Sequence, residues 1–497
     1  LLASLPVSAH AAVWDIGKGN ITVNAGSGGQ TVTQGDGAAV EDSAPVITGS
    51  STENTVTINA EKDQTANVTL SDVNIDVSSE GKAAVSTTGE GNVSIELNGD
   101  NTLKSGKGHA GLEKKNGGKL TIADEDKNGK LTAEGGKYGA GIGGGDQGAG
   151  SGITITGGEI KATGGQYGAG IGGGKGDGSD ITISGGEVNA TGGTSGAGIG
   201  GGYNGNGSDI TITDGEVNAT GGKYGAGIGG GEYGIGKDII ITGGEVNATG
   251  GRFSAGIGGG SRGTGSDITI SGGEVNASGG VNGAGIGGGL RSKGKDITVS
   301  GDTKLKVQGG DEDHYDGAGA GIGDGGSNAY GTKILGAEVE PDTSDLLTTG
   351  WIEYYAPGAD METDDPTSTT FGTASQPEKP IDPGAERGMD APLYRVTDRD
   401  GRDIAYTAEQ KGGVLTVNVD EDFAILTGRL SGIRTLKAQG VEKIVFVTKG
   451  AASAFLLSDL LGKGDSGEAY RLTHDGKAVT FTLGEKMTDV SAILTKP

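Results

Sequence analysis

Gly168-Ala-Gly-Ile-Gly-Gly-Gly174 is the stretch that decides the fold, because the same pattern returns along the chain at a nearly fixed interval. Aligned copies begin at Gly139, Gly168, Gly196, Gly225, Ser254 and Gly283, with a degenerate copy at Gly319. From 139 to 168 the interval is 29 residues, and from 168 to 196 it is 28. A period in this range is typical of repeat proteins, in which each repeat buries its apolar face only against its neighbours.

Each repeat contains three short extended runs that are closed by glycines. Ile181-Thr-Ile183 and Val188-Asn-Ala190 alternate apolar and polar residues, which is the period of two that a strand imposes. Three strands in ~29 residues fit one turn of a parallel β-helix, where each strand pairs with its equivalent one turn later, ~4.8 Å away. We therefore expect an all-β fold, a right-handed single-stranded parallel β-helix, followed by a small C-terminal α/β or α+β domain.

This register predicts that like residues stack on like residues in the interior of the solenoid. The expected interior columns are Ile142, Ile171, Ile199, Ile228, Ile257 and Ile286 on the first face, Ile153, Ile181, Ile210, Ile239, Ile268 and Ile297 on the second, and Ile160, Val188, Val217, Val246 and Val275 on the third. The 108 glycines are then expected at corners, where the backbone is crowded or takes positive φ.

The composition divides the chain of 497 residues into five segments. Residues 1–12 resemble the end of a secretory signal peptide, with Ala9 and Ala11 before the cleavage site, although a frayed apolar N-terminus is the alternative. Residues 13–137 are expected to form irregular N-terminal turns and a cap. The Gly-rich β-helix and its closing turn follow over 138–356, then a linker over 357–391 and a small domain over 392–497.

The C-terminal domain shows mixed helix and strand patterns. Residues 425–439 predict a helix, and residues 443–448 predict a buried strand. A short apolar helix is expected around residues 454–461, followed by a hairpin that turns at His474-Asp-Gly476.

The charge balance narrows the classes of partner. With 39 basic and 65 acidic side chains, the formal net charge is −26, which disfavours nucleic acid and anionic membranes. Cysteine is absent, so a disulfide framework and a thiol catalyst are excluded. No run approaches the ~20 apolar residues of a membrane span. We expect a secreted monomer, extracellular or associated with the cell wall.

One row of aspartates is a candidate metal site. Asp180, Asp209, Asp238, Asp267 and Asp296 recur at the turn before the second strand. Carboxylates ~4.8 Å apart repel by about 1 kcal/mol in water, a cost that a hard cation such as Ca²⁺ could reverse. The alternative is a solvated row of polar turns, and Lys237 and Lys295 beside two of the aspartates favour it.

A second candidate Ca²⁺ site lies over residues 124–129. Asp124, Asp126 and Asn128 supply oxygens at alternate positions, and Gly129 allows a bend. Position twelve of an EF-hand loop would be Gly135, so a complete EF-hand is excluded. A hairpin turn stabilised by the Asp124 side chain is the alternative.

A row of aromatic residues precedes the glycine motif and is the candidate carbohydrate site. Tyr138, Tyr167, Tyr224 and Phe253 occupy equivalent positions, which Ser195 and Asn282 interrupt. Sugar rings stack on aromatic faces, and a row with this pitch could follow an extended glycan. Lys137, Lys223 and Arg252 stand directly before three of these rings and favour an acidic glycan. The alternative is that each ring only covers the corner of its own turn.

Catalysis finds no support in the sequence. The four histidines, His10, His109, His314 and His474, are scattered over the predicted segments. A β-helix lyase needs unique acidic and basic residues on neighbouring turns, whereas the groups here are repeated. We expect a binding protein and no enzyme.

Several stretches resemble secreted proteins of gut Firmicutes that are called carbohydrate-binding domain-containing proteins. These stretches are residues 14–23, 68–75, 93–103 and 108–113, together with the copies of the glycine motif, so that the resemblance covers residues 13–325. It implies a parallel β-helix, and for some members binding of acidic plant polysaccharide with Ca²⁺. The matching motifs are scaffold motifs, and they transfer no ligand residue to this chain.

The sequence thus leaves two functional hypotheses of different classes. The first is a non-catalytic β-helix that binds polysaccharide along one edge or face, with Ca²⁺ as a possible cofactor. The second is a structural stalk or adhesin whose repeats project the C-terminal domain.

Overall fold

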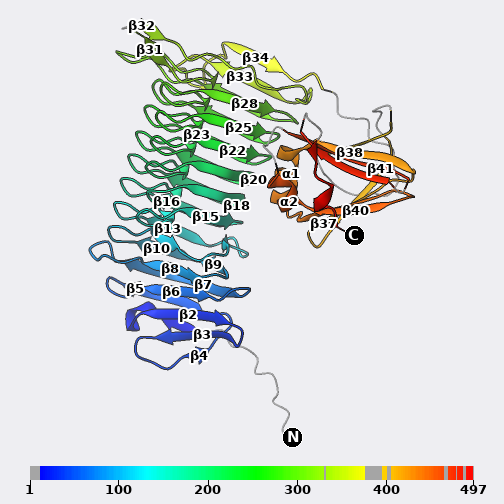
Figure 1. The fold of residues 1–497 in the computed structure, drawn as a ribbon. Helices are drawn as coiled ribbons and strands as arrows, with labels where there is room; N and C mark the ends of the chain where they lie inside the picture. Colours follow the sequence, from blue (N-terminus) through cyan, green and yellow to red (C-terminus); the bar gives the residue numbers. More distant parts are fainter. Residues whose placement is uncertain are drawn as a thin grey trace. The chain divides into compact units, whose positions relative to one another are not determined.

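The computed structural model describes residues 12–329, 332–374, 394–399, 404–463, 468–476, 478–484 and 488–495. They belong to two compact units, which meet between Gln376 and Pro377 in the chain. In the first unit, successive turns stack on one another from the N-terminal end to the yellow-green end (Figure 1). The predicted parallel β-helix is thereby confirmed. Residues 1–11 of the proposed signal peptide lie outside the described residues.

One face of the solenoid is a sheet with 13 strands in the described part of the chain. Its pairings are parallel, except that β2, β3 and β4 pair antiparallel at the N-terminal end, beside the 3-10 helix η1 (Ile16–Lys18). In order, the strands are β30 (Ile322–Gly323), β27 (Ile286–Gly287), β24 (Ile257–Gly258), β21 (Ile228–Gly229), β19 (Ile199–Gly200), β17 (Ile171–Gly172), β14 (Ile142–Gly143), β11 (Leu112–Lys114), β8 (Val85–Gly89), β6 (Val56–Ala60), β2 (Ile21–Gly26), β3 (Gly29–Gln34) and β4 (Val40–Glu41).

The other two faces count as one sheet of 19 strands within the described residues, because β18 and β20 each continue from the second face into the third. Its strands are β1 (Val13–Asp15), β5 (Val46–Ser51), β7 (Thr65–Asp76), β9 (Asn92–Asn98), β10 (Asp100–Lys104), β12 (Leu120–Ala123), β13 (Lys130–Glu134), β15 (Gly150–Ile155), β16 (Glu159–Thr163), β18 (Gly178–Thr191), β20 (Gly207–Thr220), β22 (Gly236–Ile241), β23 (Glu245–Thr249), β25 (Gly265–Ile270), β26 (Glu274–Ser278), β28 (Gly294–Val299), β29 (Lys304–Gln308), β33 (Trp351–Tyr355) and β34 (Ser368–Phe371).

The interior columns follow the predicted register. Ile181 pairs with Ile210 and Val188 with Val217, while on the first face Ile199 pairs with Ile228. All the isoleucines and valines predicted for these columns are buried. One apolar core therefore runs along the solenoid, and each turn contributes the same few side chains to it.

The corners that carry the aromatic residues contain a column of glycines. A Cβ atom on Gly222 would lie 1.5 Å from the carbonyl oxygen of Gly193, and one on Gly193 would lie 1.6 Å from that of Gly165. Neither glycine has positive φ. Glycine is therefore required here because the backbone of the preceding turn approaches so closely.

The predicted linker over 357–391 is wrong for its first part. Ser368–Phe371 forms β34, which pairs antiparallel with β33 and covers its edge. Residues 357–374 therefore belong to the solenoid unit. By pairing with β33, β34 satisfies backbone groups that an uncovered edge strand would leave unpaired. The closing turn predicted over 332–339 and 351–355 is found in part. β33 pairs in parallel with β29, whereas β32 (Thr332–Ile334) pairs with β31 (Ser327–Ala329) in a separate hairpin. Residues 375–391 lie outside the described residues.

The second unit contains two small sheets in the part of the chain that is described. The first consists of β35 (Arg395–Thr397), β38 (Phe423–Arg429), β41 (Ala469–Asp475), β42 (Ala478–Leu483) and β43 (Thr488–Asp489), and the second of β36 (Thr407–Lys411), β37 (Val414–Asn418), β39 (Lys443–Val447) and β40 (Ala452–Leu456). The helices are α1 (Leu430–Ala438), α2 (Leu457–Leu461) and the 3-10 helix η2 (Ser491–Ile493).

Two helices predicted in this unit begin later than expected. Residues 425–429 belong to β38, which lies between β35 and β41, and α1 starts only at Leu430. Similarly, β40 takes residues 452–456 before α2 begins. In both places a buried strand and the following helix share one apolar run, which hides the boundary. The strand over 443–447 and the hairpin at His474 are confirmed.

Candidate functional site

The predicted aromatic row is brought together on one edge of the solenoid. The rings of Tyr138 and Tyr167 stack at 5.3 Å between centroids with 14° between their planes. Those of Tyr224 and Phe253 stack at 5.9 Å and 11°. Since equivalent residues of neighbouring turns lie ~4.8 Å apart, the fold itself sets this ring spacing.

A second row of rings was missed in the sequence. Tyr203 and Tyr233 follow the glycine triplet, and their rings meet edge to face at 6.2 Å. Tyr203 also meets Tyr167 edge to face, at 5.5 Å. The backbone N–H of Tyr203 donates to the carbonyl oxygen of Tyr167 over 2.8 Å, which places the second row beside the first.

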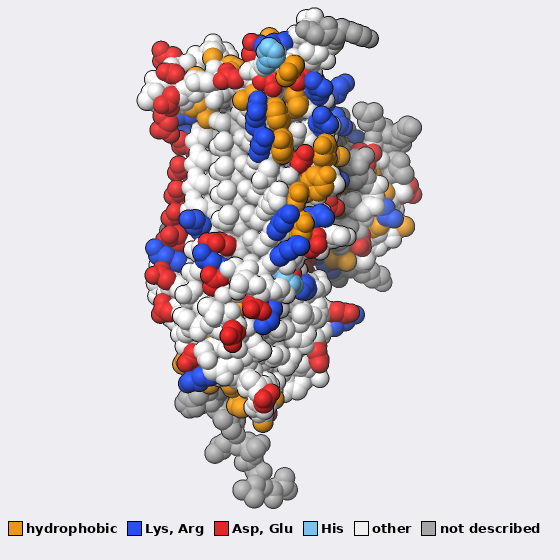
Figure 2. Space-filling model, turned by 90° about the vertical axis from the view of Figure 1, so that its left-hand side faces the viewer, with side chains coloured by type: hydrophobic (Ala, Val, Ile, Leu, Met, Phe, Trp, Pro, Cys, Tyr) orange, Lys and Arg blue, Asp and Glu red, His pale blue; other side chains and the backbone are white. Residues whose placement is uncertain are grey.

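Cationic side chains accompany these rings. Lys107, Lys137 and Lys175 lie 5.7, 5.3 and 5.2 Å from the centroid of Tyr138. Further along, the ring and cation pairs are Tyr224 with Lys223 at 5.0 Å, Phe253 with Arg252 at 4.9 Å and Tyr233 with Arg262 at 5.9 Å. Figure 2 shows the resulting stripe of orange and blue side chains. We call these six rings and six cations the aromatic edge.

The orientation of the rings differs from what glycan stacking along the whole row requires. Tyr138 and Tyr167 cover one another's faces, as do Tyr224 and Phe253. The row therefore presents mainly ring edges, and a sugar cannot lie flat on every ring. Tyr224 has no ring stacked on the side of Ser195, where the row is interrupted.

Such an interruption forms a notch of about 480 Å³. Its lining residues are Tyr138, Gln166, Tyr167, Lys175, Thr194, Ser195, Tyr203, Tyr224 and Glu232. Ser195 is buried, and its hydroxyl donates to Oε2 of Glu232 over 2.7 Å. Glu232 is the acidic residue of this lining and Lys175 the basic one, and Lys175 also pairs with Asp146 at 3.7 Å.

Beyond Phe253 the aromatic edge ends at residues 311–316, an insertion with four acidic side chains. Asn282, the second interruption of the row, is fully buried, and its amide donates to the carbonyl oxygens of Asp316 and Gly317. Arg291 forms a two-pronged ion pair with Asp316 at 2.8 and 2.9 Å. Burial acts to raise the pKa of Asp313, but hydrogen bonds from the backbone N–H groups of residues 316 and 315, with the charge of Arg252, lower it overall. The insertion thus neutralises the end of the positive stripe.

The backbone conformation explains why aspartate recurs in the aspartate row. Asp180, Asp209, Asp238, Asp267 and Asp296 all have φ between 51° and 56°, the left-handed region, and Gly152 has φ 68° at the equivalent place. Aspartate is one of the few residues other than glycine that adopts this conformation readily. Lys237 and Lys295 lie 3.5 and 3.0 Å from the neighbouring aspartates. These observations favour the polar-turn interpretation of the row.

The loop over 124–129 is also explained by local hydrogen bonds. The two carboxylate oxygens of Asp124 accept from the backbone N–H groups of Asn128 and Gly129, at 3.1 and 3.0 Å. Nearby, burial raises the pKa of Glu96, and the charges of Asp124, Glu125 and Asp126 add to this effect. Within the described residues no group of three or more His, Asp or Glu side chains could hold a metal ion. Ca²⁺ binding therefore stays a prediction without support from these residues.

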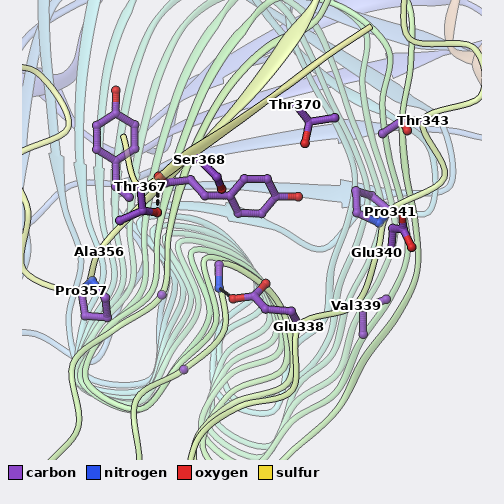
Figure 3. A pocket seen from close by; sticks show the side chains of 15 residues that line it. Glu338, Val339, Glu340, Pro341, Thr343, Ala356, Pro357, Thr367, Ser368 and Thr370 are labelled. Carbon is purple, nitrogen blue, oxygen red and sulfur yellow. Dashed lines mark hydrogen bonds between the residues drawn. The ribbon is translucent and has the colours of Figure 1, made fainter. Parts of the chain in front are cut away.

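A larger pocket, of about 650 Å³, lies at the C-terminal end of the solenoid (Figure 3). Glu338 in its lining accepts hydrogen bonds from the backbone N–H groups of Gly321 and Ile322, at 2.7 and 3.1 Å. Burial, with the nearby charges of Glu338 and Glu340, raises the pKa of Tyr354 to about 12. The Glu338 carboxylate thus accepts from backbone N–H groups of the last turn that a further strand would otherwise pair with. This pocket is therefore part of the cap.

A protein-family model described as a beta helix repeat matches residues 127–146, 153–175, 181–203, 210–232, 239–261 and 268–290. These matches coincide with the turns that carry the aromatic edge. The chain is a parallel β-helix repeat protein. Neither the curated proteins nor the solved structures that were searched gave a match to this β-helix repeat protein. Among its described residues, no helix is long and apolar enough to cross a membrane.

Proposed function

We propose that this β-helix repeat protein binds an acidic polysaccharide along the aromatic edge, without catalysing a reaction, and that it does so as a secreted or wall-associated protein. One observation carries the proposal. In a chain with a net charge of −26, six cationic side chains lie within 6 Å of five aromatic rings on one edge, those of Tyr138, Tyr167, Tyr224, Tyr233 and Phe253. Such a concentration of positive charge favours an anionic ligand against the overall charge of the molecule.

The ligand chemistry follows from the two kinds of group on the edge. Lysine and arginine attract carboxylates, and each exposed pair contributes about 0.2–1 kcal/mol. The ring edges and the open face of Tyr224 offer apolar surface to the C–H groups of a sugar. Because each contact is weak, we expect affinity to come from several contacts along one glycan chain.

Calorimetry of the full-length chain with polygalacturonate tests the proposal. The variant carries Lys137→Ala, Lys175→Ala, Lys223→Ala and Arg252→Ala, and the expected loss is about 2 kcal/mol, roughly thirty-fold in Kd. A control with the same change in net charge carries Lys62→Ala, Lys161→Ala, Lys237→Ala and Lys295→Ala, which lie away from the aromatic edge. Equal losses in the two variants would contradict binding at the edge.

Two further measurements test Ca²⁺ dependence and the stalk hypothesis. Titration with a chelator present tests Ca²⁺ dependence, which the geometry of the acidic residues does not favour. Absence of binding to acidic glycans by the folded protein would favour the stalk hypothesis instead. The continuous interior core, shared by every turn, is the observation that supports a stalk.

A further inference from the structure

The row of rings on the aromatic edge is interrupted at Ser195, between two stacked pairs. Phe253 covers one face of Tyr224, and Ser195 carries no ring to cover the other. Tyr167 and Tyr224 stand two turns apart, ~10 Å, which is about twice the distance between stacked rings. The notch is therefore the place where a single sugar ring can lie against an aromatic face.

The charges along the edge change at the same place. The residues directly before the ring positions are cationic at Lys137, uncharged at Gln166 and Thr194, and cationic again at Lys223 and Arg252. Lys137 and Lys223 are three turns apart, which corresponds to ~14 Å. Between them lies Glu232, the acidic residue that lines the notch.

We propose that the notch is a subsite for an uncharged sugar, and that the edge selects glycans in which acidic residues flank uncharged ones. This inference rests on the proposed function and specifies its ligand. An uncharged sugar can donate a hydroxyl to Glu232, because one oxygen of that carboxylate is used by Ser195 and a carboxylate accepts more than one donor. Its acidic neighbours then lie beside Lys137 on one side and Lys223 or Arg252 on the other.

An acidic sugar in the notch places its carboxylate beside Glu232, while Lys175, the cation of the same lining, already pairs with Asp146 at 3.7 Å. Two like charges about 5 Å apart repel by about 0.8 kcal/mol in water, which corresponds to a roughly four-fold weaker Kd. A fully acidic chain cannot avoid this contact while it spans both cationic clusters. A chain with spaced acidic residues can.

The experiment compares two probes of equal length that differ in the number and the spacing of their charges. Oligogalacturonate of one length is used fully de-esterified and about half methyl-esterified, and the Kd of each for the full-length chain is measured by calorimetry. Because esterification also removes carboxylates that pair with the cations, the readout is the ratio of the two Kd values. Glu232→Gln should shift this ratio about four-fold by improving binding of the fully acidic probe. The matched control is Glu245→Gln, an exposed carboxylate at the start of β23, and it should leave the ratio unchanged.

A second variant tests the shape of the notch independently of its charge. Ser195→Tyr places a ring where the equivalent positions of the neighbouring turns already carry one, so the fold accepts the residue type. It should fill the notch and weaken binding of the half-esterified probe. An unchanged ratio of the two Kd values in Glu232→Gln, or no effect of Ser195→Tyr, would overturn this inference and leave the proposed function intact. Failure of both probes to bind would overturn the proposed function as well.

Discussion

His474 Nε2 lies 2.8 Å from the Ser453 hydroxyl, in the interior of the second unit. Its other ring nitrogen lies 3.1 Å from the hydroxyl of Thr448, and the side chain is fully buried. Burial lowers the pKa of His474 to about 4, so the imidazole is neutral in the folded unit at neutral pH.

This burial predicts an acid-labile second unit. Because the pKa of the folded state lies below the unfolded value of about 6.5, protonation favours the unfolded chain. The stability that neutral His474 contributes is complete above pH 6.5 and is lost as the pH falls toward 4, by about 3 kcal/mol. Hydrogen exchange across β41 and β42, followed by mass spectrometry at several pH values, measures the effect. His474→Gln should flatten the profile, and an unchanged profile would contradict this explanation.

The row of asparagines on the third face predicts a graded loss of stability. Asn247 donates its amide to Asn218 at 3.0 Å and accepts from Asn276 at 2.8 Å, whereas Asn276 has a buried carbonyl oxygen without a partner. Removal of each hydrogen bond costs about 0.5–1.5 kcal/mol. Asn247→Ala should therefore lower the melting temperature more than Asn276→Ala does. Equal shifts in calorimetric melting would show that these bonds contribute little.

The glycine column predicts a severe steric effect at one position. In Gly222→Ala the new methyl group would lie 1.5 Å from the carbonyl oxygen of Gly193, so the turn must open. We expect a loss of more than about 3 kcal/mol, or no folded protein. Gly28→Ala is the control, since a Cβ there meets no atom within 4 Å. Thermal melting of both variants is the measurement, and a stable Gly222→Ala protein would refute the close approach.

The aspartate row predicts which replacements are tolerated. Asp209 has φ 53°, so Asp209→Asn should retain the melting temperature, while Asp209→Val should cost about 1–2 kcal/mol through backbone strain. Melting with and without added Ca²⁺ separates this effect from metal binding. If Ca²⁺ stabilises the unmodified protein but not Asp209→Asn, the row does bind metal.

Much of the solenoid was predictable, because two periods act together. The alternation within Ile181-Thr-Ile183 fixes which side chains point inward, and the 29-residue repeat fixes which residue each of them contacts. The position of Tyr203 was not predictable in this way. It reaches Tyr167 through a backbone hydrogen bond across the glycine triplet, from another part of the repeat.

The orientation of the rings also escaped prediction. The repeat places Tyr138 and Tyr167 one turn apart but does not say whether they offer their faces to solvent or to each other. That choice depends on side-chain torsions, which spacing does not encode. The sequence of the second unit has no repeat. There β38 and α1 lie within one apolar run, and the boundary between them becomes visible only because β38 pairs with β41.

The close contact between Gly222 and Gly193 also bears on how such a chain can change its length. Because every turn rests on the one before it in the same way, a whole duplicated repeat finds its contacts ready made, whereas a partial one does not. The distance between equivalent binding groups of different turns is thereby restricted to multiples of ~4.8 Å. A gene that gains or loses one repeat would change the reach of the protein by one sugar-sized step, without altering the chemistry at any single position.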